Sequence, residues 1–86
     1  MKRKTEVILY TKPGCHLCEE ARAQIRAADC AELYEMEEVN IETDPALMEL
    51  YGLKIPVITI DGTEAFRYRV SPAEFRDLIK QTSSRS

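Results

Sequence analysis

The sequence is short of the features that mark several large classes of protein. Its 86 residues include one histidine and three cysteines, and an odd number of cysteines does not close a disulfide framework. No apolar run approaches the ~18 residues of a membrane span. The basic start is followed by only four apolar residues (7–10), fewer than the ~7–15 of a signal peptide. We therefore expect a cytoplasmic protein, in a compartment where lasting disulfides are rare.

Charge, length and the absence of two motifs limit the expected partners, domains and cofactors. The formal net charge of −3 argues against nucleic acid or an anionic membrane as the main partner. A chain of 86 residues is one domain, and we expect residues 1–5 and 81–86 to fray at its ends. The sequence contains no dinucleotide-binding fingerprint and no phosphate-binding loop, so we expect no bound organic cofactor.

The first half of the chain predicts a strand, a helix and a second strand. Residues 6–11 are mostly apolar and β-branched, and Pro13 and Gly14 follow them, as expected of a buried strand before a sharp turn. From Cys15 onward, apolar residues recur every three or four positions, which is the period of one helix face. Within residues 33–42, Val39 and Ile41 alternate with polar neighbours and favour a second strand.

The second half predicts two helices around a hairpin. Asp44 is typical of a helix N-cap and precedes a proline, and Gly52 ends this short helix. A third strand over residues 56–60 leads into residues 61–62 (Asp-Gly), a strong hairpin signal. Residues 71–74 (Ser-Pro-Ala-Glu) have the pattern of a capping box that begins the last helix.

The predicted order of elements is therefore β-α-β-α-β-β-α. Two strand–helix–strand crossovers are expected, and crossovers of this kind link parallel strands. The hairpin adds an antiparallel pair, whose returning strand carries Phe66, Tyr68 and Val70 at alternate positions. The result is an α/β fold with a four-stranded mixed sheet flanked by helices.

Cys15 and Cys18 form a Cys-x-x-Cys pair at the start of the first predicted helix. A helix N-terminus carries partial positive charge and unpaired N–H groups, so cysteines in such motifs have thiol pKa values lowered from ~8.5 to ~3.5–7.5. Three residues make about one turn, which brings the sulfurs close enough to bridge. Because Cys18 begins the inward face of the helix, we expect Cys15 to be the nucleophile and Cys18 the resolving thiol.

Other interpretations of the cysteines remain open. A structural zinc site needs four ligands, and only Cys30 and His16 are left to complete one, with His16 inside the motif itself. A redox pair is the favoured interpretation, with a half zinc site or two core cysteines as alternatives. We expect Cys30 to be a structural residue at a helix end, with a regulatory or dimerising thiol as the alternative. His16 is expected at an exposed helix start, where as a cation it could tune the neighbouring sulfur.

Residues 10–18 (Tyr-Thr-Lys-Pro-Gly-Cys-His-Leu-Cys) resemble the redox loop of glutaredoxins, in the thioredoxin superfamily. The Cys-His-Leu-Cys form is most similar to that of small glutaredoxin-like proteins. Residues 55–57 (Ile-Pro-Val) are similar to the cis-proline segment of the family, and residues 61–62 to the hairpin after it. The resemblance covers residues 6 to about 80. It implies a thioredoxin/glutaredoxin-like fold and thiol–disulfide oxidoreductase activity.

The resemblance also implies roles for individual residues. Cys15 would attack a disulfide, Cys18 would release the mixed disulfide, and Pro56 in cis would face the sulfurs. The backbone of Ile55 would pair with an extended thiol peptide, such as glutathione or a substrate strand. Lys12 matches the basic residue that glutaredoxins place near a glutathione carboxylate, with a solvated loop lysine as the alternative. The expected thiol-peptide-binding residues are Lys12, His16, Ile55 and Pro56.

The sequence departs from the resemblance near the last helix. Glutathione-using members carry Gly-Gly after the hairpin strands, whereas this chain has no such pair and has Pro72, which lacks an N–H. Arg67 or Arg69 could bind a carboxylate instead, or both are solvated strand residues. The sequence does not choose between glutathione as co-substrate and a thioredoxin-reductase-type donor.

We expect a monomer that acts on disulfide-bearing proteins. A metal or iron–sulfur carrier and a redox-inactive binding module are the alternative functions.

Overall fold

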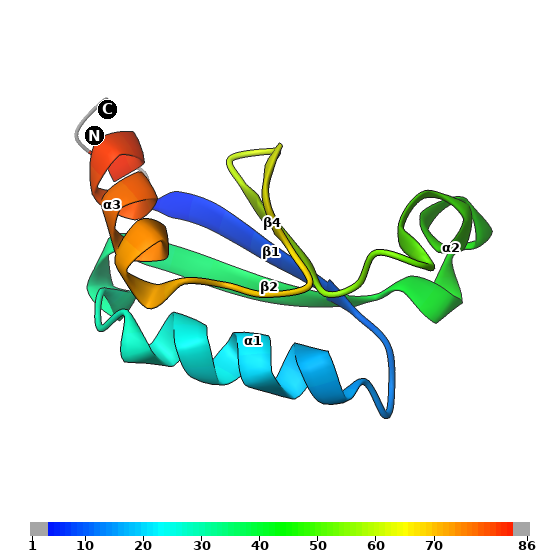
Figure 1. Cartoon of the computed structure of the whole chain (residues 1–86). Helices are drawn as coiled ribbons and strands as arrows, with labels where there is room; N and C mark the ends of the chain where they lie inside the picture. Colours follow the sequence, from blue (N-terminus) through cyan, green and yellow to red (C-terminus); the bar gives the residue numbers. More distant parts are fainter. Residues whose placement is uncertain (1–3, 84–86) are drawn as a thin grey trace.

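A four-stranded mixed sheet organises the chain, as seen in a computed structural model that describes residues 4–83 (Figure 1). In chain order the elements are β1 (Thr5–Thr11), α1 (His16–Ala27), η1 (Ala31–Leu33), β2 (Tyr34–Asn40), η2 (Ile41–Thr43), α2 (Pro45–Tyr51), β3 (Val57–Ile60), β4 (Thr63–Arg67) and α3 (Pro72–Ser83). The strands lie in the order β2-β1-β3-β4. The expected α/β fold and element order are confirmed. No helix in this part of the chain is long and apolar enough to cross a bilayer.

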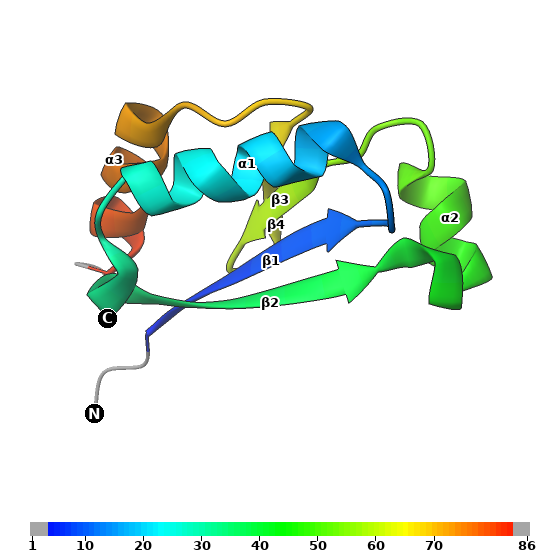
Figure 2. The ribbon, with the colours of Figure 1, turned by 90° about the horizontal axis from the view of Figure 1, so that it is seen from below.

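The direction of β3 differs from the expectation. β1 and β2 are parallel through α1, as predicted, but β3 pairs antiparallel with β1. The reason is the length and place of α2, whose seven residues span about 10 Å. This helix lies beyond the end of the sheet at which β1 and β2 finish (Figure 2). Because α2 does not run back along the sheet, the chain enters β3 from that same end. β3 therefore runs in the direction opposite to β1 and β2.

One face of the sheet and two helices enclose the main core. Alternate residues of β1 are buried on this face, against the inner sides of α1 and α3 (Figures 1 and 2). Phe75 is fully buried, and its ring meets Tyr34 edge to face with centroids 5.3 Å apart. This packing fixes α1 along the sheet, with its first turn near the end of β1. The buried members of this main cluster are Val7, Leu9, Ala21, Ile25, Ala28, Cys30, Ile58, Ile60, Val70, Phe75 and Ile79.

A smaller cluster lies at the end of the sheet where β1 finishes. The rings of Tyr10 in β1 and Tyr51 in α2 meet there at an interplanar angle of 36°, with centroids 4.6 Å apart. Asp44 caps α2 as predicted, because its carboxylate accepts the Ala46 N–H at 2.9 Å. The buried members are Cys18, Ile41 and Ile55, against which Tyr10, Cys15, Leu47 and Tyr51 pack. α2 therefore closes the end of the sheet next to the cysteines.

The β3–β4 hairpin has the two-residue turn that the sequence predicts. Asp61 and Gly62 both have positive φ, 49° and 85°, as in a type I′ turn. The Asp61 carboxylate accepts the Glu6 N–H at 2.9 Å, which ties the turn to β1. β4 ends at Arg67, earlier than its alternating pattern predicts, because Tyr68 has a φ of 69°. A strand does not continue through a residue in the left-handed region.

Within the described residues, both ends of the chain are more structured than expected. Thr5 is buried in β1, and α3 continues to Ser83. The hydroxyl oxygens of Thr5 and Ser83 lie 3.5 Å apart, and the Ser83 hydroxyl donates to the Leu33 carbonyl at 3.4 Å. These contacts join β1, η1 and α3. The rest of the expected fraying concerns residues 1–3 and 84–86, which lie outside the described residues.

Candidate functional site

A tight turn after β1 positions the first cysteine. Gly14 has a φ of 76°, a conformation that glycine adopts without steric penalty. The Cys15 N–H donates to the Lys12 carbonyl at 3.3 Å and closes the turn. The chain then enters α1 with Cys15 at its N-cap. The turn therefore sets the Cys15 sulfur at the positive end of the helix.

Cys15 and Cys18 are joined by a disulfide, with their Cα atoms 5.2 Å apart. The Cys18 N–H donates to the Cys15 Sγ at 3.2 Å, where a side-chain oxygen accepts in an ordinary helix cap. Cys15 is half-buried, whereas Cys18 is fully buried in the smaller cluster. The Cys15 side of the pair thus faces outward and the Cys18 side faces the protein interior.

The charged groups around the cysteines are loosely held. The His16 side chain is 91% exposed, and its Nδ1 lies 3.9 Å from the Glu19 carboxylate. Lys12 is half-buried and forms no ion pair within residues 4–83. Both side chains belong to the segment that carries the sulfurs, and neither is hydrogen-bonded to a sulfur within residues 4–83. The group that contacts Cys15 directly is therefore the end of α1, through the Cys18 N–H.

The segment before β3 is brought to the same place. Ile55 is buried in the smaller cluster with Cys18, and the Ile55–Pro56 peptide bond is cis. The Pro56 carbonyl accepts the Tyr68 N–H at 2.8 Å. The Ile55 N–H and carbonyl, by contrast, form no backbone hydrogen bond within the described chain. Cys18 near the start of α1 and Ile55 before β3, which are 37 positions apart in the sequence, therefore share one cluster.

The start of α3 offers few free donors to an anion. Pro72, its first residue, has no N–H, and the Glu74 N–H is taken by the Ser71 hydroxyl at 3.4 Å. The Arg67 guanidinium is paired with the Glu64 carboxylate at 2.7 Å. Of the two arginines considered for carboxylate binding, Arg67 is thus engaged on its own strand.

Tyr68 is the residue that the sequence reasoning missed. Its hydroxyl donates to the Leu53 carbonyl at 3.1 Å, and its N–H bonds to Pro56. Tyr68 therefore joins the connection that follows β4 to the segment that precedes β3. Tyr68 is 45% exposed and Leu53 is 94% exposed, so both residues present apolar surface. No sequence signal marks a tyrosine for a positive φ, because non-glycine residues adopt it rarely.

Cys30 lies apart from the cysteine pair, in the main cluster, where it is buried. Burial, and then the charge of Glu32, raise the pKa of its thiol, so this side chain is suited to a core role. Within residues 4–83, no three or more histidine, cysteine or acidic side chains converge as metal ligands.

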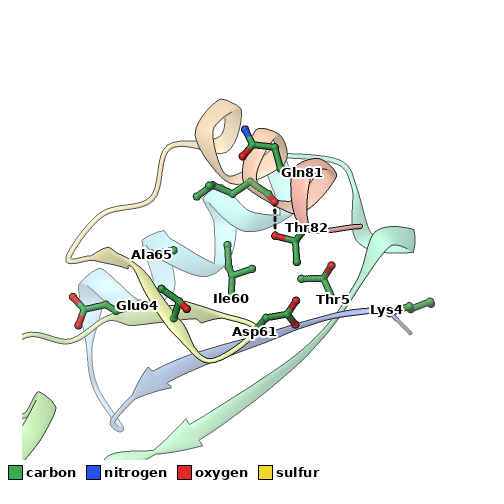
Figure 3. Close-up of a pocket in the computed structure, with 10 residues that line it drawn as sticks. Lys4, Thr5, Ile60, Asp61, Glu64, Ala65, Gln81 and Thr82 are labelled. Atoms are coloured by element: carbon green, nitrogen blue, oxygen red, sulfur yellow. Dashed lines mark hydrogen bonds between the residues drawn. The ribbon is translucent and has the colours of Figure 1, made fainter. Parts of the chain in front are cut away.

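A cavity of about 740 Å³ lies at the end of the sheet opposite to the cysteines (Figure 3). It is lined by the β3–β4 turn, the start of β1 and the end of α3, and by none of the cysteines. Two of its polar side chains already have partners, since Asp61 accepts from Glu6 and the Thr82 hydroxyl donates to the Leu78 carbonyl at 2.8 Å. We therefore place the candidate site at the cysteine pair.

The fold and the site together define a class of protein. A four-stranded sheet, a Cys-x-x-Cys pair capping α1 and a proline segment packed beside it are the arrangement of the thioredoxin superfamily. Residues 6–80 match the glutaredoxin-like domain family (DUF836), so the chain belongs to that family. No curated protein matches the chain.

Several solved structures share the fold of this chain. The target protein XcR50 from X. campestris is 28% identical, with a TM-score of 0.74 over 87% of this chain and 96% of its own. Protein Ne2328 from Nitrosomonas europaea is 27% identical, with a TM-score of 0.74 over 96% of this chain and 95% of its own. A mutant thioredoxin from Halobacterium salinarum, 14% identical, shares the fold with a TM-score of 0.67 over 94% of this chain and 76% of its own.

Proposed function

We propose that this protein is a thiol–disulfide oxidoreductase that reduces disulfides through Cys15 and Cys18. The observation that carries the proposal is the asymmetry of the pair. Cys15 is half-buried and accepts a backbone N–H at the end of α1, whereas Cys18 is fully buried behind it. In the reduced protein the same N–H and the partial positive charge of the helix would stabilise a Cys15 thiolate, which is the nucleophilic form.

The proposed reaction has two exchange steps. The Cys15 thiolate attacks one sulfur of a client disulfide, forming a mixed disulfide and releasing the other client sulfur as a thiolate. Cys18, after losing its proton to solvent, attacks the Cys15 sulfur and releases the second client thiolate. The client gains two electrons, and the protein is left with the Cys15–Cys18 disulfide. Two thiols of a donor then restore the dithiol by the reverse exchanges.

The residues around the pair receive supporting roles in this proposal. The Ile55 backbone would pair with an extended client segment, held in place by Pro56. Lys12 and His16, both on the loosely packed side, would meet polar groups of the client. No cofactor is bound in this scheme, and glutathione enters as a co-substrate or a thioredoxin-reductase-type protein as the donor. The working site would be the cytoplasm, where a reducing pool regenerates the dithiol, and the protein would act as a monomer.

A redox titration tests the proposal. Protein equilibrated in glutathione buffers is acid-quenched, alkylated and read by mass at each cysteine. We expect a Cys15–Cys18 disulfide with a midpoint between ~−180 and ~−280 mV. Cys15→Ser should abolish reduction of a model disulfide, and Cys18→Ser should accumulate the mixed disulfide on Cys15. Cys30→Ser is the matched control and should change neither.

Two results would contradict the proposal. One is full reductase activity in the Cys15→Ser variant, which would remove the nucleophile from its assigned role. The other is a cysteine pair that oxidises only after a chelator is added, which would favour the metal-carrier alternative.

A further inference from the structure

A small cavity begins beside the cysteine motif and follows one side of α1. Its volume is about 250 Å³. Leu17, which lies between the two cysteines, forms its near end, and Gln24 lies seven residues further along the helix, about 10 Å away. Opposite α1, the cavity is lined by the connection between β4 and α3. The lining residues are Leu17, Glu20, Ala21, Gln24, Tyr68, Arg69 and Val70.

The size of this cavity suits one side chain, and four of its seven lining residues are apolar. Small-molecule sites typically span ~300–1,000 Å³, and this cavity falls below that range. Ala21 and Val70 are its buried lining, at 1% and 6% exposure. Leu17 and Tyr68 are more than one-third exposed and form the apolar part nearer the surface. Glu20 and Arg69 carry opposite charges, so the cavity presents no net charge to an ionic group.

Tyr68 borders this cavity and is positioned by two hydrogen bonds. A φ of 69° is rare and sterically unfavourable for a bulky residue. Two hydrogen bonds offset that strain, from the Tyr68 N–H to Pro56 and from its hydroxyl to Leu53. The same residue therefore borders the cavity and contacts the proline segment that packs against the cysteines. An occupant of the cavity would lie next to a client bound along that segment.

The neighbouring features disfavour a small anionic thiol such as glutathione. The start of α3 has lost the N–H of Pro72 and uses that of Glu74 for its own cap. Arg67 is paired with Glu64. Arg69 is the one guanidinium that lines the cavity, and it shares the cavity with the Glu20 carboxylate, which repels an anion. A carboxylate brought here would thus lose water for one donor group facing a like charge, whereas an apolar side chain needs no donor.

We infer that this cavity is a specificity pocket for one large apolar side chain of a client polypeptide, close to the cysteine that Cys15 attacks. The inference rests on the proposed oxidoreductase function and names its substrate class. Polypeptide disulfides with such a neighbouring residue are the preferred substrates, and glutathione disulfides are poor ones.

Model peptides test the inference. Short Gly/Ser peptides carry one cysteine as a mixed disulfide with 5-thio-2-nitrobenzoate and a leucine one or two residues before or after it. The reduced Cys18→Ser, Cys30→Ser variant is used, so that the Cys15 thiolate attacks the peptide sulfur, bonds to it and expels coloured 5-thio-2-nitrobenzoate. We expect one leucine position to raise the second-order rate constant about tenfold or more over the leucine-free peptide and over the glutathione derivative.

Variants of α1 locate the effect. Gln24→Trp fills the cavity and should reduce the leucine gain to about twofold or less. Ala23→Trp, at the adjacent exposed position outside the cavity, is the matched control and should keep the gain. Leu17→Ala removes apolar lining without adding bulk and should also lower the gain, which covers the case in which the tryptophan variant does not fold.

The outcomes separate the two proposals. Equal rates for all peptides, or a glutathione derivative as fast as the best peptide, would overturn the pocket while leaving the oxidoreductase function in place. A leucine gain that survives both Gln24→Trp and Leu17→Ala would also overturn it. No release of 5-thio-2-nitrobenzoate from any of these disulfides would instead refute the oxidoreductase function itself.

Discussion

Replacing Ile41 with alanine tests whether Cys18 is kept inaccessible by its local cluster. Ile41 is fully buried in η2 and shares that cluster with Cys18 and Ile55. Truncating a buried isoleucine to alanine destabilises a protein by about 2–5 kcal/mol. The cluster is small and edged by half-buried side chains that can close over the lost volume, so we expect the lower part of that range, about 2–3 kcal/mol.

The consequence for Cys18 follows from local opening. If a local movement of this cluster exposes the thiol, the opening equilibrium shifts by the full 2–3 kcal/mol, which is about 30- to 140-fold. The assay is alkylation of Cys18 in a Cys15→Ser background, with rates read by mass and the free energy of unfolding read from urea denaturation. Cys18 in Ile41→Ala should react faster by that factor.

Ile79→Ala is the matched control for this prediction. Ile79 is also fully buried, but it lies in α3 within the main cluster. The variant should lose about 3–5 kcal/mol of unfolding free energy, yet accelerate Cys18 alkylation by less than about threefold. The reverse order, with the more destabilising Ile79→Ala giving the faster alkylation, would mean that Cys18 is exposed only by global unfolding, and the reasoning would be wrong.

Three further predictions concern stability. Gly14→Ala should lower the unfolding free energy, measured in urea, by about 1–2 kcal/mol, because a φ of 76° is unfavourable for alanine. The added Cβ meets nothing within 4 Å, so no clash adds to this loss. An unchanged free energy would mean that the turn tolerates a side chain. Asp61→Ala should lower the unfolding free energy by about 1–2 kcal/mol, because it removes the acceptor for the Glu6 N–H. Asp61→Asn should lower it less, because asparagine keeps an acceptor and tolerates positive φ. Equal losses for the two variants would show that this hydrogen bond does not stabilise the turn. Burial raises the pKa of Cys30, so the folded chain keeps this proton to higher pH than the unfolded chain, and stability should fall above about pH 8.5. Cys30→Ala should flatten that fall in a pH series of urea titrations, and an unchanged slope would assign it to other groups.

The parts of the fold that were predictable depend on residues close together in the chain. The caps of α1 and α2 and the hairpin turn are set by backbone groups within about one turn of Cys15, Asp44 and Asp61. The predicted direction of β3 was wrong, because the direction depends on where α2 lies relative to the sheet. No local sequence pattern encodes that position. The early end of β4 was missed because Tyr68 takes its φ from bonds to Leu53 and Pro56.

The thiol–disulfide chemistry proposed for Cys15 and Cys18 follows from the local sequence. Two cysteines three residues apart at a helix start place both sulfurs at the positive end of α1, because helix geometry and backbone charge are local properties. The surroundings of the two sulfurs depend on tertiary contacts. Cys18 is buried against Ile55, which precedes Pro56 in the other half of the chain. The 250 Å³ cavity likewise lies between α1 and the connection that contains Tyr68. Such proximity arises from packing of the whole sheet, because burying apolar surface rewards contacts at any sequence separation.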